Sequence, residues 1–223
     1  MSTVAAVPVK DLVHAKQRLA AFLAPAERPP LVRAMLEDVL DALAAAPSVD
    51  EVWVVTRDDA VQSLARARGM TCLTEPDNRG HTAAVALAQA EARQRGIGRF
   101  LTLPGDVPCV TAAEIERLVD VATPPRAVAF APSLSGLGTN GAALAPPDVL
   151  TLRFGEPSFA NHLEAARRRG LSPAVIRLPG LGLDIDTPED LRLLLDRGQR
   201  TRAAACLTAM GISVRLAARP APV

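Results

Sequence analysis

The stretch that decides the fold is RFLTLPGDVP, residues 99–108. Its apolar run ends at Pro104 and Gly105 and then delivers one carboxylate, Asp106, before the next helical pattern begins. This pattern predicts a buried strand that carries Asp106 to the edge of a sheet. In an open α/β sheet, ligands bind beyond the carboxyl ends of the strands, so Asp106 is a candidate functional residue. A surface turn is the alternative, because Gly-Asp-Xaa-Pro is also ordinary turn composition.

Apolar runs and helical patterns alternate outward from this stretch along nearly the whole chain. Strands are predicted at residues 3–9, 51–56, 70–73, 99–103, 127–131, 138–144 and 174–178. Helices are predicted at residues 31–46, 60–68, 83–94, 112–121, 159–169, 188–196 and 201–210. This order predicts the α/β class, as a three-layer α/β/α sandwich with a largely parallel central sheet. We expect residues 1–196 to form this domain, and residues 197–223 to form a C-terminal helical extension with a disordered tail.

A second acidic segment, LDIDTPEDL, occupies residues 183–191. Thr187 is placed to cap the following helix, and Asp190 is placed to return the capping bond. Because those two residues have a structural duty, Asp184 and Asp186 are left for chemistry.

Two other helix starts carry local signals. Thr111 and Glu114 have the spacing of a capping box. Ser158 is expected to be the N-cap of the helix at 159–169, with His162 one turn later on the same face.

The composition indicates a globular protein and excludes several classes of function. Of the 223 residues, 49% are hydrophobic and 22% are charged, with a formal net charge of +1. Such a balance offers no broad positive field for nucleic acid, and the absence of Tyr argues against a base-stacking platform. No segment has the pattern of a signal peptide or a membrane span, so we expect no membrane partner and a cytoplasmic location.

The two lysines of the chain, Lys10 and Lys16, both follow the first predicted strand. With Arg18 they would crowd the carboxyl end of that strand. A lysine ammonium is a compact point charge that suits phosphate oxygens. Two solvated side chains on a loop are the alternative.

The helix predicted at 83–94 follows a turn-rich loop that ends at Gly80. A helix start that follows glycine can bind an anion or a nucleobase through its unpaired amides, but it can equally be an ordinary cap. His81 stands at this start as a weak catalytic candidate, because no nucleophile in the sequence pairs with it.

Three carboxylates on two loops, with lysines beside the first strand, form a consistent site for magnesium and a nucleotide. Mg²⁺ is usually held by one or two carboxylates and the substrate phosphates. Its charge offsets the charge that develops at a phosphorus under attack. The sequence has no Ser/His/Asp or Cys/His arrangement, no Walker phosphate loop and no Gly-x-Gly-x-x-Gly turn after the first strand.

Five groups of motifs carry a resemblance to a known family. They are VPVK (7–10) with AKQRL (15–19), LPGDVP (103–108), GTN (138–140), FGEPSF (154–159) with His162, and DIDTPEDL (184–191). Together they resemble the CofC/FbiD family, the 2-phospho-L-lactate or phosphoenolpyruvate guanylyltransferases of deazaflavin coenzyme F-420 biosynthesis, over roughly residues 4–196. The resemblance implies a nucleotidyltransferase fold of the glycosyltransferase-A-like kind. It also implies Mg²⁺-dependent transfer of GMP from GTP to a small phosphoacid, with release of pyrophosphate.

The resemblance further implies roles for single residues. Asp106, Asp184 and Asp186 would hold magnesium. Lys16 and Arg18 would meet the GTP phosphates and form the catalytic set with Asp106.

The substrate contacts implied by the resemblance lie on three segments. Lys10, Gly80 and Thr82 would bind the nucleotide, although residues 80–82 read Gly-His-Thr where family members usually show Gly-Leu-Asn. The residues that would hold the phosphate and carboxylate of the acceptor are Thr139, Gly155 and Ser158.

Other functions and partners remain as hypotheses. One alternative is a nucleotidyltransferase of the same fold whose acceptor is molybdopterin or a sugar phosphate. The other is a non-catalytic regulator of the same fold that binds a nucleotide. The three carboxylates beside both lysines favour the enzyme. Phosphoenolpyruvate, 2-phospho-L-lactate and 3-phosphoglycerate differ by small groups worth about 1–3 kcal/mol in an apolar pocket, so all three acceptors stay open. A homodimer and a downstream lactyl-transfer enzyme are the expected protein partners.

Overall fold

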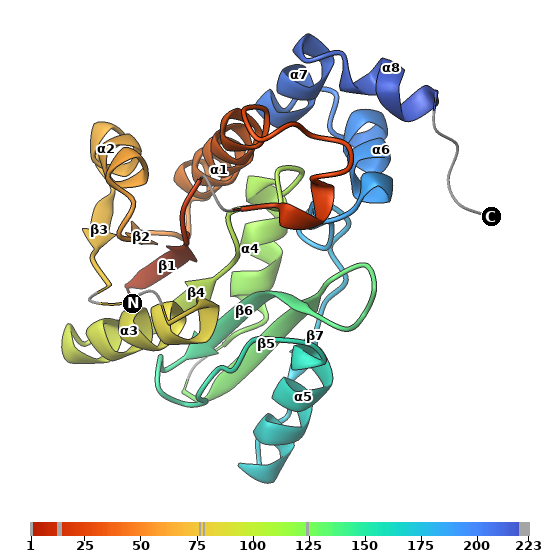
Figure 1. The fold of residues 1–223 in the computed structure, drawn as a ribbon. Coiled ribbons are helices and arrows are strands. Elements are labelled where there is room, and N and C mark those ends of the chain that lie inside the picture. Colours follow the sequence, from red (N-terminus) through yellow and green to blue (C-terminus); the bar gives the residue numbers. More distant parts are fainter. Residues whose placement is uncertain (1, 13–14, 76, 78, 124, 219–223) are drawn as a thin grey trace.

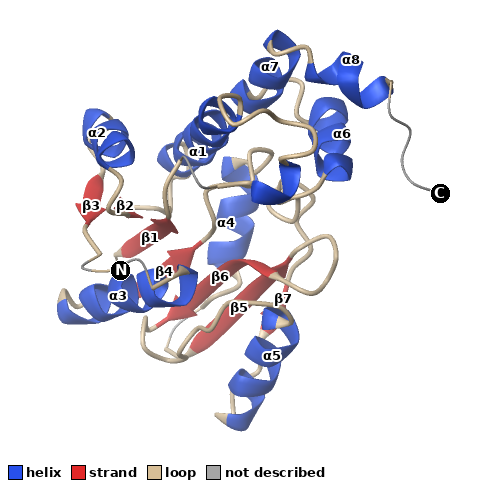
Figure 2. Ribbon diagram, in the orientation of Figure 1, coloured by secondary structure: helices blue, strands red, loops and turns tan. Residues whose placement is uncertain are grey.

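A seven-stranded sheet lies between two layers of helices in the computed structural model, which describes residues 2–12, 15–75, 77, 79–123 and 125–218 (Figures 1 and 2). The strands are β1 (Thr3–Pro8), β2 (Glu51–Val55), β3 (Thr71–Leu73), β4 (Arg99–Thr102), β5 (Ala127–Pro132), β6 (Thr139–Ala145) and β7 (Ala174–Val175). Their order in the sheet is β3-β2-β1-β4-β6-β5-β7. Only β6 runs antiparallel to its neighbours β4 and β5, so β6 begins at the edge where the other strands end.

Eight α-helices in the described residues cover the two faces of the sheet. They are α1 (Arg28–Ala44), α2 (Asp59–Ala67), α3 (His81–Gln94), α4 (Ala112–Asp120), α5 (Ser158–Arg168), α6 (Pro188–Arg197), α7 (Arg202–Ala209) and α8 (Ile212–Ala217). A short 3-10 turn, η1 (Gln17–Leu19), follows β1. Figure 1 shows α3 and α5 on one face of the sheet, with the other helices on the opposite face. The predicted three-layer sandwich is confirmed.

Alternation along the strands builds one hydrophobic core on each face. On β1, Ala5 and Val7 join the core under α1, whereas Val4 and Ala6 join the core under α3. All six residues of β1 are buried, because a central strand of a sandwich is covered on both sides. This explains why residues 4–8 form an uninterrupted apolar run.

Most predicted elements differ from their observed bounds by one or two residues, and α1 and β7 differ by more. Helix α1 begins at Arg28, earlier than the predicted Leu31, because proline fits the first turn of a helix, where an amide hydrogen is not needed. Strand β7 has two residues in place of the predicted 174–178, and it lies at the edge of the sheet, where it pairs with β5 alone.

The C-terminal helices α7 and α8 pack into the same core as α1, to which they contribute Ala203, Leu207, Ile212 and Leu216. The domain boundary at residue 196 stays a prediction. The predicted disordered tail, residues 219–223, lies outside the described residues. Along the described chain, no helix combines the length and the apolar character needed to cross a membrane.

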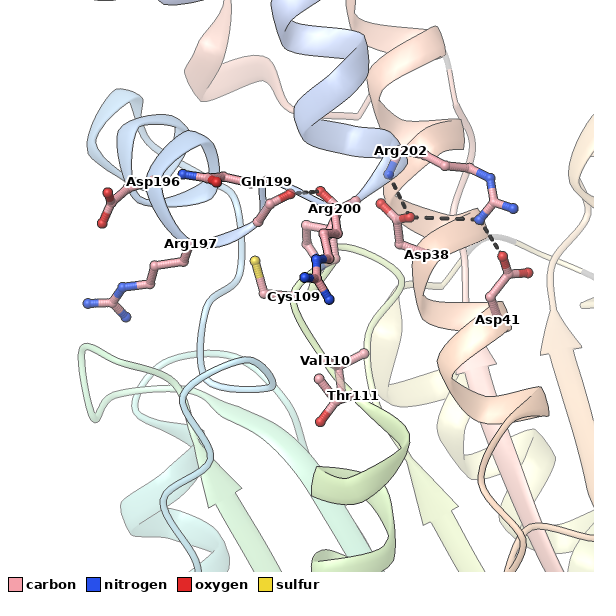
Figure 3. A pocket seen from close by; sticks show the side chains of 13 residues that line it. Asp38, Asp41, Cys109, Val110, Thr111, Asp196, Arg197, Gln199, Arg200 and Arg202 are labelled. Carbon is pink, nitrogen blue, oxygen red and sulfur yellow. Dashed lines mark hydrogen bonds and ion pairs between the residues drawn. The ribbon is translucent and has the colours of Figure 1, made fainter.

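A hollow of about 620 Å³ lies where the segment joining α6 and α7 meets α1 and the loop before α4 (Figure 3). Arg202 forms an ion pair with Asp41, and the backbone amides of Arg202 and Ala203 donate to Asp38 at 2.8 and 2.9 Å. Burial raises the pKa of Asp38, whereas those two amides act to lower it. The charged groups on this wall therefore secure α7 against α1.

Candidate active site

Loops from distant parts of the chain meet at the edge where the parallel strands end. Lys10 follows β1 and Asp106 follows β4, whereas Thr139 begins the antiparallel β6. The backbone amide of Ile185 donates to the carbonyl of Asp106 at 3.1 Å, which ties the second acidic segment to the first. The structure therefore brings both acidic segments together, as the sheet argument predicted.

Lys16 bridges the two acidic segments. Its Nζ lies 2.5 Å from Oδ2 of Asp106 and 2.8 Å from Oδ1 of Asp186, and its side chain is only 5% exposed. Burial acts to lower the pKa of Lys16, but the attraction of the two carboxylates outweighs it, and the pKa is raised. Lys16 also has a φ of 56°, the left-handed conformation that non-glycine residues rarely adopt. Such backbone strain is concentrated at functional sites, because only strong surrounding contacts sustain it.

One carboxylate oxygen of Asp106 is not used in the contacts with Lys16. Its Oδ1 is buried and has no hydrogen-bond partner in the described structure. The guanidinium of Arg18 lies 3.9 Å from Oδ2 of Asp186 and is 74% exposed, so it stands at the solvent side of the cluster. Carboxylate oxygens are the ligands that Mg²⁺ prefers, so Asp106 and Asp186 fit this ion.

Asp184 is held by Asn140, a residue that the sequence analysis did not assign. Nδ2 of Asn140 donates to Oδ1 of Asp184 at 2.9 Å and to the carbonyls of Leu181 and Gly182, each at 3.1 Å. The pKa of Asp184 is raised by burial and also by the charges of the other two aspartates, whereas the Asn140 bond opposes this. Among the described residues, no three His, Cys, Asp or Glu side chains gather as a ready metal site. The magnesium role of Asp184 stays a prediction.

A cavity of about 270 Å³ opens beside the Lys16 cluster. Of the predicted site residues, all of which the structure describes, four line it: Lys10, Lys16, Asp106 and Asp186. His81 lines it as well, so the weak candidate does reach the site. Burial lowers the pKa of His81 to about 4, so its imidazole is neutral near pH 7. The ring lies against Phe154, with 4.3 Å between centroids.

The start of α3 is tied to the segment before α5. The backbone amide of Phe154 donates to Oγ1 of Thr82 at 2.9 Å, so the Thr82 hydroxyl already has a structural partner. Gly80 precedes α3 with a φ of 89°, which a side chain would strain. The nucleotide contacts expected of Gly80 and Thr82 stay predictions.

Two of the three residues predicted to bind the acceptor, Thr139 and Ser158, are in contact with each other. Ser158 is not an N-cap, contrary to the prediction: Pro157 holds that position, and Oγ of Ser158 accepts the backbone amide of Thr139 at 3.0 Å. Oγ1 of Thr139 lies 2.9 Å from Nδ1 of His162. Gly155 is exposed with a φ of 113°, and no atom lies within 4 Å of the place that a Cβ would occupy, so conformation rather than space requires glycine there.

With this geometry established, similarity to known proteins identifies the family. The sequence pattern of the family described as "Guanylyl transferase CofC like" matches residues 3–222. The chain belongs to the CofC guanylyltransferase family. The match includes α7 and α8, so it extends beyond the limit of roughly residue 196 that the sequence motifs indicated.

Two relatives in the CofC family illustrate the range of acceptors. A phosphoenolpyruvate guanylyltransferase of Sphaerobacter thermophilus is 46% identical over 194 residues, covering 87% of this chain and 93% of the relative. A 2-phospho-L-lactate guanylyltransferase of Methanothermobacter thermautotrophicus is 38% identical over 216 residues, covering 96% of this chain and 94% of the relative.

The fold has a solved counterpart outside these relatives. A putative nucleotide-diphospho-sugar transferase from Desulfovibrio desulfuricans G20 superposes with a TM-score of 0.78 at 18% identity, covering 96% of this chain and 98% of that one. This likeness confirms the predicted nucleotidyltransferase fold.

Proposed function

We propose that this chain is a magnesium-dependent guanylyltransferase that transfers GMP from GTP to the phosphate of a small phosphorylated carboxylic acid. The observation that carries the proposal is the Lys16 cluster with Asp106 and Asp186, at the carboxyl edge of the sheet and on the wall of a cavity. The names of the two relatives support the choice of GTP and a phosphoacid.

The reaction needs little proton transfer. A phosphate oxygen of the acceptor attacks the α-phosphorus of GTP, the bond from that phosphorus to the α,β-bridging oxygen breaks, and pyrophosphate leaves with the electron pair. The second pKa of a phosphomonoester is about 6, so the attacking oxygen is already ionised near pH 7. A general base is therefore unnecessary, which fits His81 and His162, whose pKa values are lowered to about 4.

The main requirement is to offset negative charge in the transition state. Lys16 and Lys10 supply cations at the cavity, and Arg18 stands at its solvent side. Asp106, through the unpartnered Oδ1, and Asp186 would hold Mg²⁺. When bound, this ion adds positive charge that the side chains alone do not provide.

The acceptor would be bound by Thr139 at the start of β6, by Gly155 in the segment before α5 and by Ser158, the first residue of α5. Phosphoenolpyruvate, 2-phospho-L-lactate and 3-phosphoglycerate are the candidates, and membership of the CofC family favours a place in coenzyme F-420 biosynthesis. A reaction that consumes GTP suits the cytoplasm. The homodimer and the downstream lactyl-transfer enzyme belong to this proposal as well.

The proposal is tested by pyrophosphate release from purified protein. GTP, ATP, CTP and UTP are each supplied with each of the three acids, with Mg²⁺ or with EDTA. We expect release only with GTP, a phosphoacid and Mg²⁺ together. Equal release with all four nucleotides would contradict guanine selectivity, and undiminished release in EDTA would contradict the metal requirement.

A further inference from the structure

His162 lies at the centre of a buried polar network that joins α5 to the first residue of β6. His162 is only 2% exposed. Its Nε2 lies 2.9 Å from the backbone nitrogen of Arg153, and its Nδ1 lies 2.9 Å from Oγ1 of Thr139. A backbone amide can only donate, so Nε2 must carry the lone pair. A neutral imidazole has one donor and one acceptor, so the proton is on Nδ1 and is donated to Thr139.

This tautomer is fixed by the surroundings of the ring. Phe130 stacks on the imidazole with 5.4 Å between centroids and 12° between planes, and Phe154 meets it edge-on at 5.3 Å and 74°. Burial lowers the pKa of His162 to about 4, so the ring is neutral near pH 7. The ring therefore presents Nδ1–H to Thr139 throughout the neutral range.

The tautomer decides what the Thr139 hydroxyl can do. In the described structure, Oγ1 of Thr139 is met by Nδ1–H of His162 and, at 3.5 Å, by the hydroxyl of Ser158, and both can donate to it. The Thr139 hydroxyl proton is then left for an acceptor from outside the chain. With the opposite tautomer, Thr139 would donate to Nδ1 of His162 and would have no proton to offer.

We propose that His162 is a positioning residue for the acceptor substrate. By donating to Oγ1, it leaves the Thr139 hydroxyl free to donate a hydrogen bond to a phosphate or carboxylate oxygen of the phosphoacid. The inference rests on the proposed function, in which Thr139 contacts the acceptor. His162 itself touches no substrate and acts only through Thr139.

Substitutions at His162 separate positioning from simple support of the fold. His162→Phe keeps an aromatic ring between Phe130 and Phe154 but loses both hydrogen bonds. His162→Gln supplies one amide donor and one carbonyl acceptor, so it can replace both bonds. The control is Gln89→Leu on α3, because Gln89 is 8% exposed and donates to the carbonyls of Pro147 and Leu150 at 2.8 and 2.9 Å.

Steady-state kinetics and melting temperatures are measured on all three variants. We expect His162→Phe to raise the acceptor KM about 10-fold or more, equivalent to about 1.4 kcal/mol, with the GTP KM nearly unchanged. His162→Gln should recover most of the loss. Gln89→Leu should lower the Tm and leave both KM values unchanged. A His162→Phe protein that matches Gln89→Leu, with a lower Tm and both KM values unchanged, would overturn the inference.

The tautomer has its own test, which does not depend on turnover. Two-bond ¹⁵N–¹H correlation spectra of wild-type protein should show His162 protonated on Nδ1 alone from pH 8 to pH 5.5. Protonation on Nε2, or a second proton above pH 6, would overturn the inference even in a fully active enzyme. If the wild-type protein transfers no GMP, the proposed function is overturned, and so is the role of His162 in acceptor binding. The ¹⁵N shifts of His162 would still show which nitrogen faces Thr139 with a proton. The two failures are therefore distinguishable.

Discussion

Lys16 and Asp106 are joined by a 2.5 Å ion pair although 90 residues separate them in the chain. The same ammonium reaches Asp186 at 2.8 Å, so one buried cation offsets two carboxylates that would otherwise repel each other. In the proposed function, phosphates and a metal ion enter this same cluster. The charge balance between Lys16 and its two partners is therefore the feature on which activity depends.

Asp106→Asn should abolish turnover while the protein stays folded. In the proposed function, the change removes a charge that would hold Mg²⁺, and it removes one of two acidic partners of Lys16. We therefore expect kcat/KM to fall about 100-fold or more. Loss of one charged hydrogen bond should lower the unfolding free energy by no more than about 3 kcal/mol. The matched control is Asp148→Asn, whose exposed carboxylate pairs with Arg93 at 3.2 Å, outside the lining of the cavity. If Asp106→Asn and its control were equally active, the site would be wrongly assigned.

Asn140→Asp should disrupt the acidic segment more than its small size suggests. In the structure, Nδ2 of Asn140 donates to three oxygens. An aspartate at this position would place a carboxylate oxygen beside those three acceptors, with no hydrogen to share. We expect the unfolding free energy to fall by about 3 kcal/mol, and kcat/KM to fall with it, because Asp184 loses its anchor. The stability loss should shrink as the pH falls, because a protonated carboxyl can donate again. The control is Asn161→Asp, at an exposed position on α5, which should change neither the unfolding free energy nor kcat/KM. Denaturant unfolding at pH 8 and pH 4.5 gives the unfolding free energy of both variants.

Gly155→Ala should weaken acceptor binding through the backbone. Gly155 has a φ of 113° and open space around it, so alanine meets strain without a clash. We expect a loss of about 1–2 kcal/mol in stability and a rise in the acceptor KM, with little change in the GTP KM. Gly69→Ala carries a comparable strain, at a φ of 71° after α2, and should lower stability alone. Identical kinetics in the two variants would remove Gly155 from the acceptor site.

The stability of the protein should fall in mild acid, in part through His162. Its folded pKa of about 4 lies below the ordinary 6.5, so the unfolded chain binds the proton first as the pH falls. Stability is then lost between about pH 6.5 and pH 4, and at pH 5 this amounts to about 2 kcal/mol at 1.36 kcal/mol per pKa unit. Urea unfolding of wild type and His162→Gln at pH 8 and pH 5 checks the difference. A parallel decline in both proteins would show that His162 is not the group that titrates.

Short-range features of the fold were predictable because their causes are local. The Thr187–Asp190 box joins residues three apart, and both of its bonds are present. The box at Thr111 and Glu114 is present as well. The position of Asp106 at the sheet edge followed from a buried strand that ends in Pro and Gly.

Long-range partners were not predictable, because nothing in the local sequence records them. Ser158 has the composition of a cap, but its hydroxyl accepts the amide of Thr139, 19 residues away. Asn140 donates to Asp184 across 44 residues, and its place beside Thr139 in the GTN motif (138–140) was its one signal in the sequence. The separate roles of the metal, nucleotide and acceptor residues remain predictions.

In the proposed function, the Lys16–Asp106–Asp186 cluster catalyses the formation of a phosphoanhydride between GMP and the phosphate of the acid. The most direct measurement is ³¹P NMR of the products from GTP, Mg²⁺ and each of the three phosphoacids. We expect two coupled phosphoanhydride resonances together with pyrophosphate in wild type, and neither in Asp106→Asn. Unchanged GTP, or pyrophosphate accompanied only by free GMP, with all three acids and folded wild-type protein would contradict the proposed function.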